Sequence, residues 1–169
     1  MRFGHIGPLL IVGFLLVASL ASAQDPNQMS YAGIKESKFM NLPVLPSCMT
    51  ISPQRGDPMK EKAVILAKAT TGCQVPWHWH SVSESLMIVS GRGKAEMKDG
   101  GSHTVTTGDF LYLPAKQTHQ FTCTANCVFF ISTDGAFDIH YVDKDGKEVP
   151  PEQVLKQSPK AGMKKPTTK

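Results

Sequence analysis

The chain has 169 residues and a formal net charge of +4, and this length suits one domain with a core of useful size. Most of the positive charge comes from lysines, several of which lie near the C-terminus, at Lys156, Lys160, Lys164, Lys165 and Lys169. No arginine and no interleaved aromatic residue accompanies these lysines, so we expect a solvated tail and no nucleic-acid partner.

Residues 1–23 have the features of a secretion signal. Arg2 supplies a positive charge, residues 9–20 are an almost unbroken apolar run, and Ala21-Ser22-Ala23 offers the small residues that a signal peptidase needs. We expect cleavage after Ala23, which leaves 146 residues (169 − 23) with a formal charge of +3 (4 − 1), and export to a periplasm or to the cell exterior. The apolar run is short for a bilayer span, so we expect no stable membrane insertion after processing. An uncleaved N-terminal anchor is the alternative.

Residues 24–62 are predicted to form an extended arm with turns, because they are rich in Pro, Ser, Asn and Met and lack a sustained helical period. From residue 63 to residue 142, short β-rich runs alternate with Gly-rich turns, which predicts a single all-β domain built as an antiparallel sandwich or barrel. The runs are 63–67, 78–80, 86–89, 94–97, 104–106, 110–113, 120–123, 128–132 and 137–142. Residues 143–169 are predicted to be a flexible basic tail, in which only residues 152–157 look faintly helical.

Four cysteines would remain after cleavage, and an even number in an exported chain permits two disulfides. Cys123 and Cys127 flank Thr-Ala-Asn, which could form a hairpin turn between two apolar strands and bring the pair into cross-strand register. We favour this bond, and Cys48 with Cys73 is then the remaining pairing. The sequence leaves the connectivity open, and all four could instead be buried thiols. The spacing lacks the paired CxxC of a zinc site.

The two faces of the strand around residues 77–80 differ in chemistry. His78 and His80 share one face, so Trp77 and Trp79 must point to the other. Residues 86–89 are apolar on both faces, so something should cover the outer face of the sheet. The arm or a second subunit could cover it, and the tryptophans could form the centre of a homodimer contact. Alternatively, the tryptophans pack between the two sheets of one subunit.

The segment Trp-His-Trp-His-Ser-Val-Ser-Glu at residues 77–84 indicates a metal site. The imidazoles of His78 and His80 aim at one point, and the carboxylate of Glu84 can reach that point from the next strand. His119 follows the run at 110–113 and becomes a third imidazole ligand if the chain pairs back there. Such a set suits one divalent transition-metal ion (Fe, Mn, Ni, Cu or Zn), whereas Ca²⁺ and Mg²⁺ prefer oxygen. Otherwise these histidines are ordinary polar residues at strand ends.

Two sequence motifs give the chain its resemblance to the cupin superfamily. The first, G(X)5HXH(X)3,4E(X)6G, is filled without a gap from Gly72 to Gly91. The second, G(X)5PXG(X)2H(X)3N, is followed from Gly108 through Pro114 to His119. The glycines Gly91 and Gly108 fall at turns where a positive φ or a close backbone approach is needed.

The resemblance covers residues 63–142 and departs from the family at two positions. Lys116 stands where the family often has glycine, and Cys123 stands where it often has asparagine. Neither position is a metal ligand in the family. The resemblance implies a jelly-roll barrel (a double-stranded β-helix) that holds one metal ion inside, through His78, His80, Glu84 and His119.

The expected function is a metal-dependent enzyme, oxygenase-like, that acts on a small oxygen-bearing molecule. Four protein ligands on an octahedral ion leave two positions open for such a molecule, and Glu84 could double as a catalytic proton acceptor. The competing interpretation is a non-catalytic protein that binds or senses a metal and a small ligand, and a purely structural metal comes third.

Strand parity also predicts the walls of the pocket. The face of His119 carries Phe121 and Cys123, and the face of Glu84 carries Leu86 and Ile88, so we expect a largely apolar wall. Few polar side chains remain to act as a base, and the further candidates are His140 with Asp138, Tyr112 and Lys116.

Overall fold

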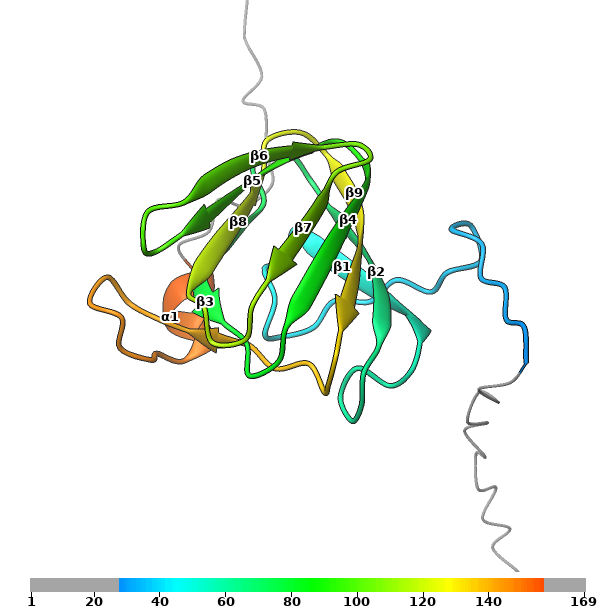
Figure 1. The fold of residues 1–169 in the computed structure, drawn as a ribbon, viewed down its shortest axis with the longest axis horizontal. Helices are drawn as coiled ribbons and strands as arrows, with labels where there is room; N and C mark the ends of the chain where they lie inside the picture. The colour runs from blue at the N-terminus through cyan, green and yellow to red at the C-terminus, as the bar shows by residue number, and fades with distance from the viewer. Residues whose placement is uncertain (1–27, 157–169) are drawn as a thin grey trace, which may run out of the picture.

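The computed structural model describes residues 28–156, which fold into two five-stranded antiparallel sheets and one short helix (Figure 1). The strand order is β1-β2-β9-β4-β7 in the first sheet and β10-β3-β8-β5-β6 in the second. The strands are β1 Met49–Arg55, β2 Val64–Ala69, β3 Gln74–Trp79, β4 Glu84–Ser90, β5 Arg92–Met97, β6 Ser102–Thr106, β7 Phe110–Leu113, β8 His119–Cys123, β9 Cys127–Thr133 and β10 His140–Tyr141, and helix α1 is Pro151–Leu155. The predicted all-β, jelly-roll class is confirmed.

The strands from β4 to β9 lie where the sequence predicts them, within two residues at each end. The predicted run at 78–80 is instead the end of the longer β3, and His80 lies just after it. Of the predicted run at 137–142, only β10 is a strand. The backbone before β10 bonds to a loop instead of a strand, since the Phe137 N–H donates to the Pro58 carbonyl over 2.7 Å. Helix α1 falls on the faintly helical part of the predicted tail.

Strand β1 lies inside the segment that the sequence predicts to be an extended arm. It pairs antiparallel with β2, with Ile51 opposite Ala67 and an irregularity between Pro53 and Arg55. Proline cannot donate to a ladder, and it is tolerated here because β1 is the edge strand of its sheet. The first sheet therefore begins before residue 63, and Met49 adds a buried side chain to the core.

The segment before β1 is fixed to the rest of the molecule. A disulfide joins Cys48 to Cys73, across a sequence separation of 25 residues. In the chain-entropy model, a loop of this length stabilises the folded state by roughly 3–4 kcal/mol. The buried hydroxyl of Tyr141 donates a hydrogen bond to the Val44 carbonyl over 2.8 Å. The Cys48–Cys73 pairing predicted from the sequence is confirmed.

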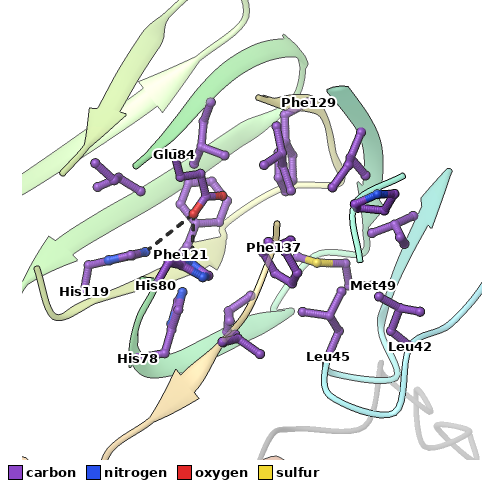
Figure 2. A pocket seen from close by; sticks show the side chains of 18 residues that line it. Leu42, Leu45, Met49, His78, His80, Glu84, His119, Phe121, Phe129 and Phe137 are labelled. Carbon is purple, nitrogen blue, oxygen red and sulfur yellow. Dashed lines mark ion pairs between the residues drawn. The ribbon is translucent and has the colours of Figure 1, made fainter. Parts of the chain in front are cut away.

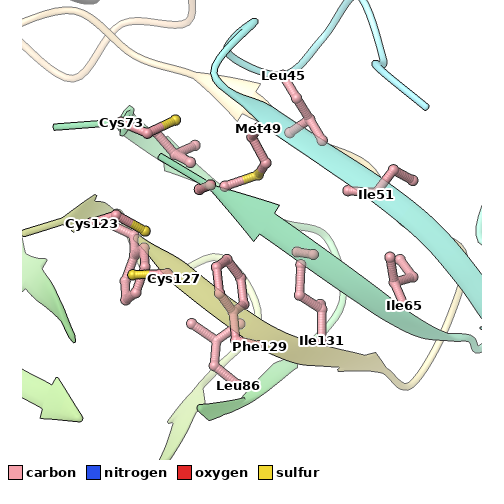
Figure 3. Close-up of a cluster of buried hydrophobic side chains, with 14 of the residues drawn as sticks. Leu45, Met49, Ile51, Ile65, Cys73, Leu86, Cys123, Cys127, Phe129 and Ile131 are labelled. Carbon is pink, nitrogen blue, oxygen red and sulfur yellow. The ribbon is translucent and has the colours of Figure 1, made fainter. Parts of the chain in front are cut away.

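The predicted Cys123–Cys127 disulfide is wrong. Both thiols are free and buried (Figure 3). Cys123 ends β8 in one sheet, and Cys127 begins β9 in the other, so Thr-Ala-Asn crosses between the sheets instead of closing a hairpin within one of them. The cross-strand register on which the prediction rested is therefore not formed. The hydrogen bond that the Cys123 thiol donates to Cys127 Sγ, together with burial, raises the pKa of Cys123, so this thiol stays protonated.

The outer faces of the two sheets only partly follow the prediction. Trp77 and Trp79 lie on the face opposite the histidines, where both are half-buried, and Trp79 stacks on His140 with ring centroids 3.9 Å apart. They do not pack between the sheets. Over β4 and β7 no described segment forms a complete cover, since Phe110 is 63% exposed and Tyr112 is 55% exposed. The homodimer stays a prediction.

Two further predictions concern the ends of the chain. The predicted signal peptide, and the part of the predicted tail from residue 157 onward, lie outside the described residues. Within residues 28–156, no helix has the length and apolar character needed to cross a membrane.

Candidate metal centre

The four predicted ligands come together at one end of the two sheets (Figure 2). The second sheet supplies the imidazoles: His78 lies opposite His119 in the β3–β8 ladder, and His80 follows directly after β3. The first sheet supplies the carboxylate, because Glu84 begins β4, where it pairs with Leu113 on one side and with Thr133 on the other. The site therefore requires both sheets to be packed together.

The donor atoms of these side chains converge within a few ångströms. The ligand nitrogens of His78, His80 and His119 lie within 4.8 Å of one another. Glu84 Oε2 lies 2.9 Å from His80 Nε2 and 4.0 Å from His119 Nε2. All four residues are buried, with exposed fractions of 2–7%.

Each imidazole is held by its other ring nitrogen. Nδ1 of His78 contacts the Pro76 carbonyl over 2.6 Å, Nδ1 of His119 contacts the Gln117 carbonyl over 2.9 Å, and Nδ1 of His80 contacts the Asp138 carbonyl. A carbonyl can only accept, so each Nδ1 carries a hydrogen and donates it. In a neutral ring, the lone pair of Nε2 then faces the centre of the cluster, which is the arrangement of a metal-binding histidine.

The charges in the cluster favour one shared proton. Burial, followed by the neighbouring His119 and His80, lowers the pKa of His78 well below its usual range, and burial also lowers the pKa of His119. Burial would lower the pKa of His80 too, but the Glu84 carboxylate outweighs burial and raises it. Burial would raise the pKa of Glu84, but the neighbouring His80 outweighs burial and lowers this pKa. These directions favour an ion pair that shares one proton between His80 and Glu84, and neutral rings at His78 and His119.

This arrangement passes a simple test of fit to a cation. Among residues 28–156, His78 Nε2 has no hydrogen-bond donor, although it is buried and its lone pair faces the cluster. A buried acceptor without a partner is costly, and a cation at the centre would satisfy it while replacing the shared proton. The three buried histidines can bind a metal ion.

The turn between β7 and β8 bonds to the backbone of His80 and leads into the strand that begins with His119. Lys116 occupies the position where the resembled family often has glycine, and it has a positive φ of 63°. Its N–H donates to the His80 carbonyl over 2.8 Å. The left-handed turn is thus kept without glycine, at a cost of roughly 1–2 kcal/mol. The prediction for the motif glycines is confirmed, since φ is 94° at Gly91 and 91° at Gly108.

The cluster opens on a cavity with an apolar wall (Figure 2). Phe121 and Leu86 line it as predicted, whereas Cys123 and Ile88 do not line it, because they lie further along their strands. Sequence reasoning missed the residues that arrive from outside the central strands. These are Leu42, Leu45, Met49, Ile51, Pro58, Phe137 and Ile139. Their only sequence signal is apolarity, which does not say where a loop will pack.

The other predicted polar candidates lie away from the cavity. His140 contacts Asp138 Oδ2 over 3.2 Å and Glu148 Oε2 over 3.4 Å, outside the cavity lining. Tyr112 is exposed and donates to the Ser83 hydroxyl over 3.2 Å. The Lys116 side chain is exposed as well. The cluster therefore contains the four predicted ligands and none of these additional candidates.

Comparisons with family models and with solved structures both match this chain to cupins. Residues 66–133 match the family model of the cupin domain. Similar solved structures include an RmlC-like cupin from Ralstonia eutropha (TM-score 0.59, 15% identity, covering 78% of this chain and 85% of that one) and the polyketide cyclase RemF from Streptomyces resistomycificus (0.58, 15%, 70% and 90%). A candidate acetylacetone dioxygenase from Methylibium petroleiphilum is also similar (0.57, 14%, 75% and 90%). No curated protein matches the sequence significantly.

Proposed function

Because the chain belongs to the cupin superfamily, we propose that it binds one divalent transition-metal ion through His78, His80, Glu84 and His119 and acts as an enzyme on a small oxygen-bearing molecule. The observation that carries this proposal is the buried cluster itself, in which backbone carbonyls hold the three imidazoles so that Nε2 faces Glu84. The donor set suits Fe, Mn, Ni, Cu or Zn.

A bound ion of this kind would act as a Lewis acid on an oxygen of the substrate and, if it is iron or copper, would support oxygenation. The protein itself positions the ligand side chains and excludes water from the site. The backbone carbonyls fix the rings of the histidines, and the apolar wall keeps bulk water away from the cluster. Glu84 Oε2, which lies 2.9 Å from His80 Nε2, is placed to accept a proton from the substrate.

Two names among the similar structures, a polyketide cyclase and a candidate acetylacetone dioxygenase, support an enzymatic assignment at the level of the fold. A second function has an observation of its own. Among residues 28–156, the cavity lining contains no polar side chain besides the four ligands, so Glu84 and the histidines are the acid–base groups of this part of the chain that face a ligand there. Such a site also suits a non-catalytic protein that binds or senses a small ligand.

We also propose that the protein is exported and is able to form a homodimer. The Cys48–Cys73 disulfide supports export, because disulfides persist in oxidising compartments. The exposed Phe110 and Tyr112 on β7 support a contact with a second copy. Fractionation of cells that produce the full chain, and the mass of the purified protein in solution, test these two points. A full-length reduced cytosolic protein would contradict export.

The assay that decides between catalysis and simple binding is turnover by the metal-loaded protein. With Fe(II) and a panel of small diols, enols and carboxylates, we expect O₂ uptake together with product formation. Replacing Glu84 with glutamine should lower the turnover number by about 100-fold or more, because the proton acceptor is lost. Tight binding without turnover across the panel, in metal-replete protein, would contradict catalysis and favour the binding function.

A further inference from the structure

The three imidazoles of the cluster are not held in the same way. Nδ1 of His78 and Nδ1 of His119 each donate a hydrogen bond to the carbonyl two residues earlier in the chain, so these two rings are held locally. Nδ1 of His80 donates instead to the carbonyl of Asp138, which lies 58 residues further along, in the loop between β9 and β10. The orientation of the His80 ring therefore depends on a contact with a distant segment.

Asp138 contacts the same part of the chain a second time, through its side chain. Carboxylate Oδ1 accepts a hydrogen bond from the Ser81 N–H over 2.8 Å, and Oδ2 lies 3.2 Å from Nε2 of His140. A hydrogen bond from a backbone N–H to a charged carboxylate is among the stronger kinds. Asp138 thus holds two successive residues, since its backbone carbonyl bonds to the His80 ring and its carboxylate bonds to the next peptide N–H.

The residue on the other side of this contact, His140, is itself fixed to the strand that carries two of the ligands. It pairs with Trp79 in the β10–β3 ladder, and the two rings stack with their centroids 3.9 Å apart and their planes 5° from parallel. Trp79 lies between His78 and His80 in the sequence. The carboxylate of Asp138 is therefore held between the backbone of the β3–β4 loop and a ring that is packed against β3.

We propose that Asp138 is a positioning residue of the metal site. Its carboxylate, bonded to the Ser81 N–H, keeps its own backbone carbonyl on Nδ1 of His80, and Nε2 of that ring is thereby kept aimed at the cluster. Asp138 does not line the cavity, so it acts through His80 and not on the ion. This role rests on the proposed function, because it concerns a ligand of the proposed metal ion.

Two substitutions of Asp138 test this role by metal affinity, measured on the full chain by competition for Zn(II) with a chromogenic chelator. Asp138→Ala keeps the backbone carbonyl but removes the bond to Ser81, and we expect it to weaken zinc binding by about 10- to 100-fold, because His80 loses its fixed orientation. Asp138→Asn keeps an oxygen that can accept from the Ser81 N–H. We expect this variant to bind zinc within about threefold of the unmodified protein.

Asp134 provides the matched control in the same loop. Its Oδ1 accepts a hydrogen bond from the Ser83 N–H over 3.0 Å, which is the same kind of bond to the same β3–β4 loop. The carbonyl of Asp134 holds none of the three rings, because each Nδ1 is bonded to another carbonyl. Asp134→Ala should therefore leave the zinc affinity unchanged, although it also removes a bond that anchors the loop.

A second readout does not depend on metal. In the metal-free protein, NMR observes an imidazole N–H when its exchange with water is slow, as expected for the three buried Nδ1–H groups. In Asp138→Ala the signal of His80 should disappear, whereas those of His78 and His119 should persist. All three signals should persist in Asp134→Ala.

The outcomes separate this role from the metal site itself. Unchanged zinc affinity and a retained His80 signal in folded Asp138→Ala, or equal losses of affinity in the Asp134 and Asp138 variants, would overturn the positioning role and leave the metal site intact. If the unmodified protein does not bind zinc, the proposed function fails, and the NMR comparison still shows whether Asp138 holds His80. If Asp138→Ala does not fold, Asp138→Leu, which resembles aspartate in shape but has no acceptor, takes its place with the same expected results.

Discussion

Replacing His78 with alanine is expected to weaken the binding of a divalent metal by at least 100-fold, about 2.7 kcal/mol, and to leave the purified protein without metal. His78 is the ligand best suited to this test. Its Nε2 has no hydrogen-bond donor among the described residues, so its removal leaves the His80–Glu84 pair in place. The measurement is competition for zinc with a chromogenic chelator, together with elemental analysis of protein purified without a histidine tag.

The matched control is His103→Ala, which removes an exposed histidine on β6. This variant should keep the metal affinity of the unmodified protein. The melting temperature of each metal-free variant shows whether the fold has survived. Metal content that is unchanged in a folded His78→Ala protein would mean that the cluster is not the metal site.

Replacing Gly91 with alanine is expected to destabilise the protein by roughly 3–5 kcal/mol. Gly91 has a φ of 94°, which disfavours any side chain, and a Cβ at this position would lie 1.9 Å from the Asn126 carbonyl oxygen. The obstacle is backbone at the start of β9, which cannot rotate away as a flexible side chain would. Urea unfolding, analysed by linear extrapolation, measures the loss.

Gly108 provides the matched control for Gly91, because it shares the unusual backbone but lacks the obstacle. Its φ is 91°, and a Cβ there would have no atom within 4 Å. Gly108→Ala should therefore cost only the backbone strain, roughly 1–2 kcal/mol. Equal losses in the two variants would show that the close approach to Asn126 does not matter.

The candidate site was predictable because it depends on local spacing. Strand parity places His78 and His80 on one face, and the motif spacing then predicts His119 beside His78 and Glu84 at the facing end of the other sheet. The same reasoning placed Phe121 and Leu86 in the cavity wall correctly. These inferences need only the period of a strand and the order of the strands.

The features that the sequence did not reveal depend on contacts between distant segments. β1 contains Pro53, which argues against a strand until its place at the sheet edge is known. Cys123 and Cys127 look like a hairpin pair, but the chain changes sheets between them. Leu42 and Phe137 reach the cavity from loops, and no local pattern marks that destination. Each case is decided by tertiary packing, which short-range propensity does not encode.

The most direct measurement of the metal site is anomalous X-ray scattering from crystals of the metal-loaded protein, recorded on both sides of the absorption edge of the bound element. A single strong peak is expected between the two sheets, roughly 2.0–2.2 Å from Nε2 of His78, His80 and His119 and from a carboxylate oxygen of Glu84. A peak elsewhere on the molecule, or no peak in crystals grown with excess metal, would contradict the assignment.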